Sequence, residues 1–118
     1  MVKEIKNHND LKVYDNGCHT RDIMHVTDVC RAIKLVMEKG KVDEIYNIGS
    51  GKQTSVKEVL DLASDMCEYK GNLISIDTPD FHKVVQGLQH FYLDTSKLDQ
   101  LGFNPLYDTK DIVRELCL

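Results

Sequence analysis

The stretch "YNIGSGKQTSVKEVL", residues 46–60, joins an apolar run to an amphipathic run through a glycine turn. The apolar run, "EIYNI" at residues 44–48, has the β-branched and aromatic content of a strand. Ser55 and Glu58 have the spacing of a helix-capping box, and apolar side chains recur every three or four residues from Val56 onward. The stretch therefore predicts a strand, a turn and a helix, which is the succession of elements found in α/β proteins.

The Gly51-Lys52 pair in this turn raises the question of a phosphate-binding loop. A Walker motif needs a glycine five residues before Gly51 and a Ser or Thr after Lys52, but the sequence has Tyr46 and Gln53 there. The dinucleotide fingerprint fails as well, because no third glycine follows Gly51 at the required spacing. We therefore interpret the turn as structural, since it leads a strand into a capped helix.

The rest of the chain continues the mixed pattern, and we expect about four short strands and about four helices in one α/β (mixed α+β) domain covering residues 1–118. A chain of 118 residues, 42% of them hydrophobic, has the size of one domain with one core. Further strands are predicted in "LKVYDNG" (11–17), "NLISID" (72–77) and "HFYLD" (90–94). The other helices are predicted to follow caps at Thr27 or Asp28, at Asp94 and at Asp108.

Composition excludes several classes of function. The 15 Lys and Arg against 19 Asp and Glu give a net charge of -4, without a basic cluster, so we expect no nucleic-acid partner. No apolar run approaches the roughly twenty residues that span a bilayer, so we expect no membrane association. The charged start "MVKEIKNHND" lacks the apolar stretch of a signal peptide, which predicts a cytoplasmic protein.

The cysteines and histidines do not form a recognisable metal motif. The four cysteines have no C-x-x-C spacing, and Cys30 and Cys67 fall on apolar helix faces, where cysteine acts as a small hydrophobic residue. The five histidines are scattered, and none stands three or four residues from another ligand type on a predicted helix. We predict no metal site.

Three motifs together resemble one family. "LKVYDNG" followed by "TRDIMHVTDV" (20–29), then "YNIGSGKQTSVKEVL", then "FYLDTSKLDQLGFNP" (91–105), is similar to the carboxyl-terminal part of the extended short-chain dehydrogenases. These are the NAD-dependent nucleotide-sugar epimerases and dehydratases, and the resemblance covers nearly the whole chain. It implies a substrate-binding subdomain without its Rossmann half.

The resemblance also implies what this chain lacks. The family's NAD-binding glycines and its catalytic Tyr-x-x-x-Lys pair belong to the amino-terminal half, and no tyrosine here is followed four residues later by lysine. We therefore expect no catalytic residue and no cofactor in this chain, with NAD bound only in complete relatives. Residues 44–48 would be a late strand of the Rossmann sheet whose neighbours are absent. Their uncovered edge predicts a homodimer, or a missing Rossmann half as partner.

By the same resemblance, Arg21 matches the arginine that contacts the diphosphate of the substrate, and Tyr14, with Lys12 two residues before it, matches the strand end that packs against the nucleotide base. The alternatives are a surface arginine paired with Asp22 or Asp28, and a core tyrosine.

Two departures from the family pattern weaken this binding site. Asp15 stands where relatives commonly have glycine, and its charge should repel a diphosphate. The segment "TPDFHKVVQG" (78–87) lacks a second arginine, for which His82 or Lys83 would have to substitute. His25 belongs to the Arg-Asp motif, where we expect a packing and hydrogen-bonding role.

The leading hypothesis is a substrate-domain fragment that at most binds a nucleotide diphosphate sugar and is not catalytic alone. The alternative is a non-catalytic self-associating module that has lost the ancestral ligand. An independent small enzyme is a third possibility, but no nucleophile and base pair is visible to support it.

Overall fold

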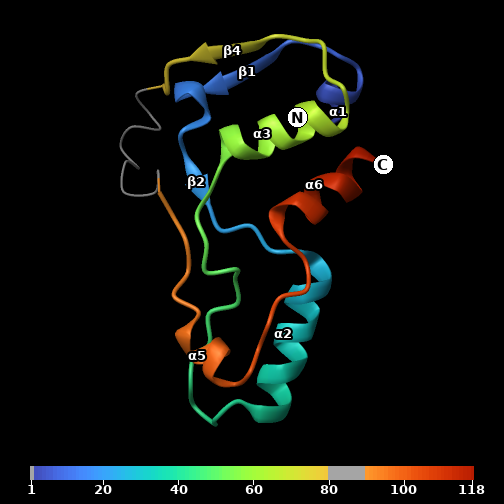
Figure 1. Cartoon of the computed structure of the whole chain (residues 1–118). Helices are drawn as coiled ribbons and strands as arrows, with labels where there is room; N and C mark the ends of the chain where they lie inside the picture. Colours follow the sequence, from blue (N-terminus) through green and yellow to red (C-terminus); the bar gives the residue numbers. More distant parts are fainter. Residues whose placement is uncertain (1, 80–89) are drawn as a thin grey trace.

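The computed structural model describes residues 2–79 and 90–118, which form an elongated, flat molecule of 49 × 36 × 15 Å. One end holds the sheet of β1 and β4 with α1, α3 and α6, and the other end holds α2 and α5 (Figure 1). The elements in chain order are α1 (Val2–Lys6), β1 (Leu11–Tyr14), the 3₁₀ helix η1 (Asp15–Gly17), β2 (Thr20–Arg21), α2 (Val26–Lys39), β3 (Thr54–Ser55), α3 (Val56–Met66), β4 (Leu73–Ile76), α5 (Ser96–Gln100) and α6 (Thr109–Cys117). The mixed α/β class is confirmed.

Two small sheets hold the strands. β1 pairs with β4 in parallel, from Leu11 opposite Leu73 to Tyr14 opposite Ile76. β2 pairs with β3 in an antiparallel arrangement, with Thr20 opposite Ser55. The strands predicted within residues 11–17 and 72–77 are therefore confirmed, and α3 lies on the connection between β1 and β4.

The strand predicted at residues 44–48 is wrong, because these residues belong to no helix or strand. A strand requires a neighbour for its backbone hydrogen bonds, and the described part of the chain places none beside this segment. Ile45 is 80% exposed as a result. The apolar composition of this segment suggests a buried strand, but neither sheet of the described residues includes it. The strand predicted at residues 90–94 is wrong as well, since only an isolated bridge between His90 and Thr20 forms there.

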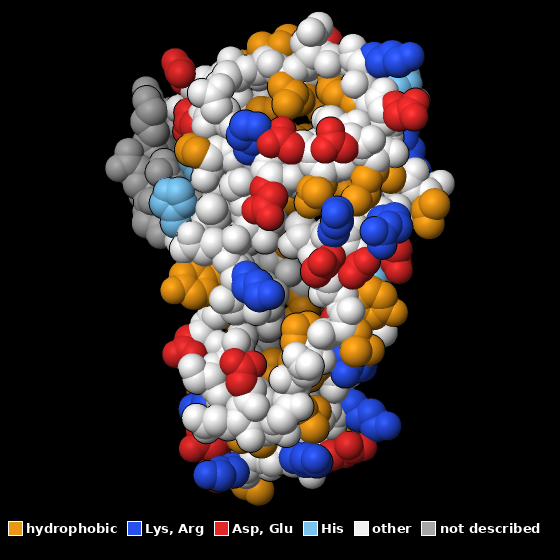
Figure 2. All heavy atoms as spheres, in the orientation of Figure 1, with side chains coloured by type: hydrophobic (Ala, Val, Ile, Leu, Met, Phe, Trp, Pro, Cys, Tyr) orange, Lys and Arg blue, Asp and Glu red, His pale blue; other side chains and the backbone are white. Residues whose placement is uncertain are grey.

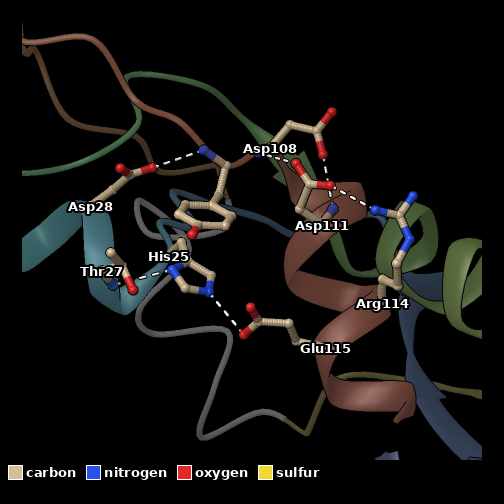
Figure 3. Close-up of polar contacts among 8 residues, drawn as sticks. His25, Thr27, Asp28, Asp108, Asp111, Arg114 and Glu115 are labelled. Carbon is tan, nitrogen blue, oxygen red and sulfur yellow. Dashed lines mark hydrogen bonds and ion pairs between the residues drawn. The ribbon is translucent and has the colours of Figure 1, made fainter.

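The main core lies between α1, β1, α3 and α6. Its buried members are Ile5, Leu11, Leu60, Ala63 and Val113. α3 begins as predicted, with the Ser55 hydroxyl accepting from the Glu58 amide at 3.0 Å. The Asp108 cap of α6 is likewise confirmed and forms a complete capping box with Asp111 (Figure 3).

The start of α2 differs from the prediction. His25 caps this helix, because its Nδ1 accepts from the Thr27 amide at 3.1 Å, so neither Thr27 nor Asp28 is the cap. Asp28 lies inside the first turn and is fully buried. Its carboxylate turns away from the helix end toward the chain that leads into α6 (Figure 3).

The predicted apolar face of α2 is only partly covered. Ala32 is buried, but Ile33 is 45% exposed and Met37 is 82% exposed. Val42, just after the helix, is also exposed. Figure 2 shows hydrophobic side chains at the surface on this side of the molecule. Cys30 is exposed as well, which corrects its expected packing role.

Candidate functional site

A pocket of about 360 Å³ lies where β1 and β2 meet α3, and we name it the β1 pocket. It is lined by Leu11, Lys12, Val13 and Tyr14 of β1, by His19 and Arg21, and by Val56 and Leu60 of α3. The structure thus brings the three residues predicted from the sequence, Lys12, Tyr14 and Arg21, into one concavity. Whether they bind a ligand remains a prediction.

Local structure explains how these side chains meet. Lys12 and Tyr14 are two residues apart in β1, so they project to the same side of the strand. Arg21 lies in β2, which is fixed by its pairing with β3, and its Nη1 donates to the Thr20 carbonyl at 2.7 Å. Tyr14 is 44% exposed, so it is not a core tyrosine. Asp28, one of the alternative partners considered for Arg21, forms its ion pair with Arg31.

The lining combines charge with apolar surface. Lys12 and Arg21 supply two cationic groups, while Leu11, Val56 and Leu60 supply aliphatic walls. Such a mixture suits an organic anion, because the apolar walls exclude water and the cations fix the charged end. The planar Arg21 guanidinium in addition offers paired donors that match phosphate oxygens.

Asp15 and His19 lie beside the pocket in a hydrogen-bonded group with Thr78. The Asp15 carboxylate accepts from the Thr78 amide at 3.1 Å, from the Thr78 hydroxyl, and from His19 Nε2 at 3.1 Å. The hydrogen bond from the Thr78 side chain is the main cause that lowers the pKa of Asp15. Its charge is therefore engaged by Thr78 and His19, and Asp15 does not line the pocket itself.

The backbone at Asp15 explains why glycine suits this position. Asp15 has φ 45°, in the left-handed region that favours glycine, and Asn16 follows with φ 55°. Aspartate and asparagine are among the few other residues that enter this region. Asp15 therefore adopts here a backbone conformation that glycine also adopts readily.

Asp22, the second residue of the Arg-Asp motif, anchors the glycine turn. Its carboxylate accepts from the Ser50 amide (2.7 Å), the Ser50 hydroxyl (2.6 Å), the Gly51 amide (3.0 Å) and the Leu93 amide (3.1 Å). Burial acts to raise the pKa of Asp22, but these hydrogen bonds lower it by more. A Cβ at Gly49 would lie 2.7 Å from Asp22 Oδ2, so a larger residue there would displace the Asp22 carboxylate. The turn thus binds a carboxylate of its own chain, in accord with its structural interpretation.

His25 joins the start of α2 to α6. It is 7% exposed, and its ring stacks on Tyr107 with 4.0 Å between centroids. Because Nδ1 accepts from the Thr27 amide, Nε2 carries the hydrogen that is donated to Glu115 at 2.9 Å (Figure 3). The expected packing and hydrogen-bonding role of His25 is what the structure shows.

His19, Val56 and Leu60 are lining residues that the sequence reasoning missed. A signal for His19 was present, because it stands two residues before Arg21 and an extended chain places such residues on one side. No comparable signal existed for Val56 and Leu60, whose periodicity indicates only a buried face. His82 and Lys83, considered as substitutes for a second arginine, lie outside the described residues.

A larger cavity of about 620 Å³ lies between the glycine turn and the segment that leads into α6. It contains none of Lys12, Tyr14 and Arg21. Its charged residues are of both signs, including Lys52, Lys110 and Asp108, so it does not favour an anion as the β1 pocket does.

In residues 2–79 and 90–118, no three His, Cys, Asp or Glu side chains are grouped to hold a metal ion. The helices of the same residues are too short or too polar to cross a bilayer.

Comparison with known proteins gives consistent matches. The family model for GDP-mannose 4,6 dehydratase matches residues 1–116. A putative UDP-glucose 4-epimerase of Methanocaldococcus jannaschii is 33% identical over 97% of this chain, and a dTDP-glucose 4,6-dehydratase of Actinoplanes sp. is 32% identical over 90%. These matches cover 35% and 32% of the two relatives, so the chain spans about a third of their length.

Solved structures show the same fold. The UDP-glucose 4-epimerase of Thermotoga maritima, crystallised with UDP-glucose, superposes with a TM-score of 0.84 at 24% identity. The dTDP-glucose 4,6-dehydratase of Bacillus anthracis, in complex with NAD, gives 0.81 at 24% identity. Each match covers 98% of this chain and 36% of the solved one.

Proposed function

The chain belongs to the GDP-mannose 4,6-dehydratase family of extended short-chain dehydrogenases, and from this premise we propose that it is a single substrate-binding domain of a nucleotide-sugar epimerase or dehydratase. In this proposal it binds a nucleoside diphosphate sugar in the β1 pocket and does not catalyse alone. The observation that carries the proposal is the meeting of Lys12, Tyr14 and Arg21 in one pocket.

Each of these residues has a role that suits its chemistry. The Arg21 guanidinium binds the diphosphate through paired hydrogen bonds, and the Lys12 ammonium adds a second positive charge. The half-exposed Tyr14 ring offers a flat apolar face to the nucleotide base. The aliphatic walls from β1 and α3 reduce the access of water to the bound ligand.

The same proposal assigns no catalytic residue and no cofactor to residues 1–118. Two relatives are named as an epimerase and a dehydratase, and one solved relative holds NAD. In complete relatives, NAD supplies hydride transfer. The Tyr-x-x-x-Lys pair that accompanies it in the family is absent from this sequence. A cytoplasmic location remains a prediction from charge and hydropathy.

Arg21→Ala is expected to weaken UDP binding about tenfold, because the variant loses a charge-assisted contact with the diphosphate. Isothermal titration calorimetry of the 118-residue chain with UDP measures this change, and dTDP and GDP identify the preferred base.

The matched control is Arg114→Ala, which removes an exposed arginine that pairs with Asp111 on α6, away from the pocket. This variant should bind UDP like the parent chain. If the parent binds none of the three nucleotides, or if Arg21→Ala binds as tightly as the parent, the proposed function is wrong.

The self-associating module is the second candidate, and exposed apolar residues near the end of α2 and in the segment after it favour it. Met37, Val42 and Ile45 are 82%, 89% and 80% exposed. Exposed apolar side chains that gather on one surface are typical of a surface that another protein covers, which supports this candidate. In our proposal the cover is a second copy of the chain or, in a longer protein, the Rossmann half.

Met37→Glu is expected to convert a dimer into a monomer, because a charge placed in an apolar interface is costly to desolvate. Size-exclusion chromatography with light scattering reports the mass, and Lys34→Glu on the same helix is the control, because the Lys34 side chain is 76% exposed. A monomeric parent chain at micromolar concentration would contradict the homodimer.

A further inference from the structure

His19 lines the β1 pocket, but neither the family motifs nor the proposed function gives it a role. It lines the pocket together with Lys12, Tyr14 and Arg21. Its side chain is 16% exposed, and its carbonyl accepts from the Val56 amide at 3.0 Å, which fixes the backbone against the start of α3. Among the lining residues, His19 has the one side chain of a type that ordinarily changes charge between pH 5 and 8.

The hydrogen bonds of His19 define which ring nitrogen carries the hydrogen. Nε2 lies 3.1 Å from Asp15 Oδ2 and 3.4 Å from the Thr78 hydroxyl. The Asp15 carboxylate is an acceptor, so Nε2 carries a hydrogen and donates it. Nδ1 is then the ring atom left to meet a ligand. In the neutral ring Nδ1 is an acceptor, and it becomes a donor only when the ring takes up a proton.

Negative charge would flank His19 on two sides once an anion is bound. The Asp15 carboxylate lies at Nε2, and a phosphate would lie on the side of the pocket. Lys12 and Arg21 are cations of the same lining, and an anion offsets both. The charged or titratable residues on the elements around His19 are Lys12 and Tyr14 (β1), Asp15 (η1), Arg21 (β2), Lys57, Glu58, Asp61 and Asp65 (α3), Asp77 (after β4) and His90 (bridged to Thr20).

We propose that His19 is a further ligand-contacting residue, which takes a proton from solvent on Nδ1 as a nucleoside diphosphate binds and donates it in a hydrogen bond to a phosphate oxygen. Asp15 and Thr78 act as positioning residues, because they hold Nε2 and the plane of the ring. This inference rests on the proposed function, since it names the protonation that accompanies binding at the same pocket. Asp15 then supports binding through His19 although its own charge is negative.

UDP binding by the 118-residue chain is expected to be about fivefold tighter at pH 6.5 than at pH 8.0, with net uptake of protons. Calorimetry in two buffers of different ionisation enthalpy measures both quantities. UDP itself titrates at about pH 6. The comparison is therefore made with His19→Gln, which keeps a polar side chain of similar length but cannot change its charge.

His19→Gln should retain UDP binding with a smaller pH dependence and less proton uptake. Asp15→Asn, which tolerates the same backbone conformation, should reduce proton uptake more than it reduces binding at pH 6.5. Circular dichroism checks that each variant is folded.

The outcomes separate this inference from the proposed function. If UDP binds and the pH dependence and proton uptake are the same in His19→Gln as in the parent chain, the role of His19 is wrong and the proposed function stands. If UDP binds at neither pH, both are wrong.

Discussion

Asp28→Ala is expected to lower the free energy of unfolding by about 3 kcal/mol, because it removes a fully buried carboxylate and leaves its donors unpaired. The Asp28 carboxylate accepts from the amides of Leu106 (2.9 Å) and Tyr107 (3.0 Å) and from Arg31. These contacts attach α2 to a segment almost eighty residues later in the chain. Urea denaturation followed by circular dichroism measures the change.

Asp61→Ala is the control for this variant, since Asp61 pairs with Lys57 on the surface of α3 and is 53% exposed. Its loss should change stability by less than about 0.5 kcal/mol. Equal effects of the two substitutions would contradict the anchoring role of Asp28.

The same substitution tests the pH dependence of stability. Burial acts to raise the pKa of Asp28, but the hydrogen bonds from Tyr107, Arg31 and Leu106 lower it by more. Since this pKa is lower in the folded than in the unfolded chain, the contribution of Asp28 is fully present above about pH 4 and is lost as pH falls through the folded pKa. Asp28→Ala should therefore lose less stability than the parent chain on acidification through this range.

Asp22→Ala is expected to lower the free energy of unfolding by about 2 kcal/mol and to loosen the glycine turn locally. The variant deprives Ser50, Gly51 and Leu93 of their acceptor. Hydrogen exchange of these three amides, followed by NMR, should accelerate more than exchange in the core of α3. Asp94→Ala is a suitable control, because within the described residues the Asp94 carboxylate accepts only from the amide and hydroxyl of the nearby Ser96.

If the three amides exchange no faster in Asp22→Ala than in the parent chain, the carboxylate does not hold the turn. The pKa of Asp22 is lowered in the folded chain, as is that of Asp28. The contribution of Asp22 to stability is therefore lost as pH falls, so acid should loosen the glycine turn of the parent chain.

The sequence predicted those elements whose signals are local. The Ser55 and Asp108 caps are confirmed because the bonded amides lie three residues away. The cap of α2 and the strand at residues 44–48 were wrong for a common reason. The Asp28 carboxylate accepts from the amide of Tyr107, which is distant in sequence, and not from the start of its own helix. A strand likewise depends on neighbouring strands, which the pattern of one segment does not reveal.

The candidate site likewise contains residues that could be predicted from the sequence and residues whose role depends on distant segments. Lys12, Tyr14 and Arg21 were identified through the family resemblance, and the pairing of β1 and β2 with other strands places them in one pocket. The group of Asp15, His19 and Thr78 escaped prediction, because Thr78 is 63 residues from Asp15 along the chain. Its contact depends on the parallel pairing of β1 with β4.

The residues of the main core lie far apart in the sequence, which has a consequence for biosynthesis. β1 leaves the ribosome well before its partner β4, which begins at Leu73, and the core also requires Val113. The nascent polypeptide must therefore carry unburied Leu11 and Leu60 until Val113 has been synthesised, which delays folding of this core and exposes the chain to chaperones.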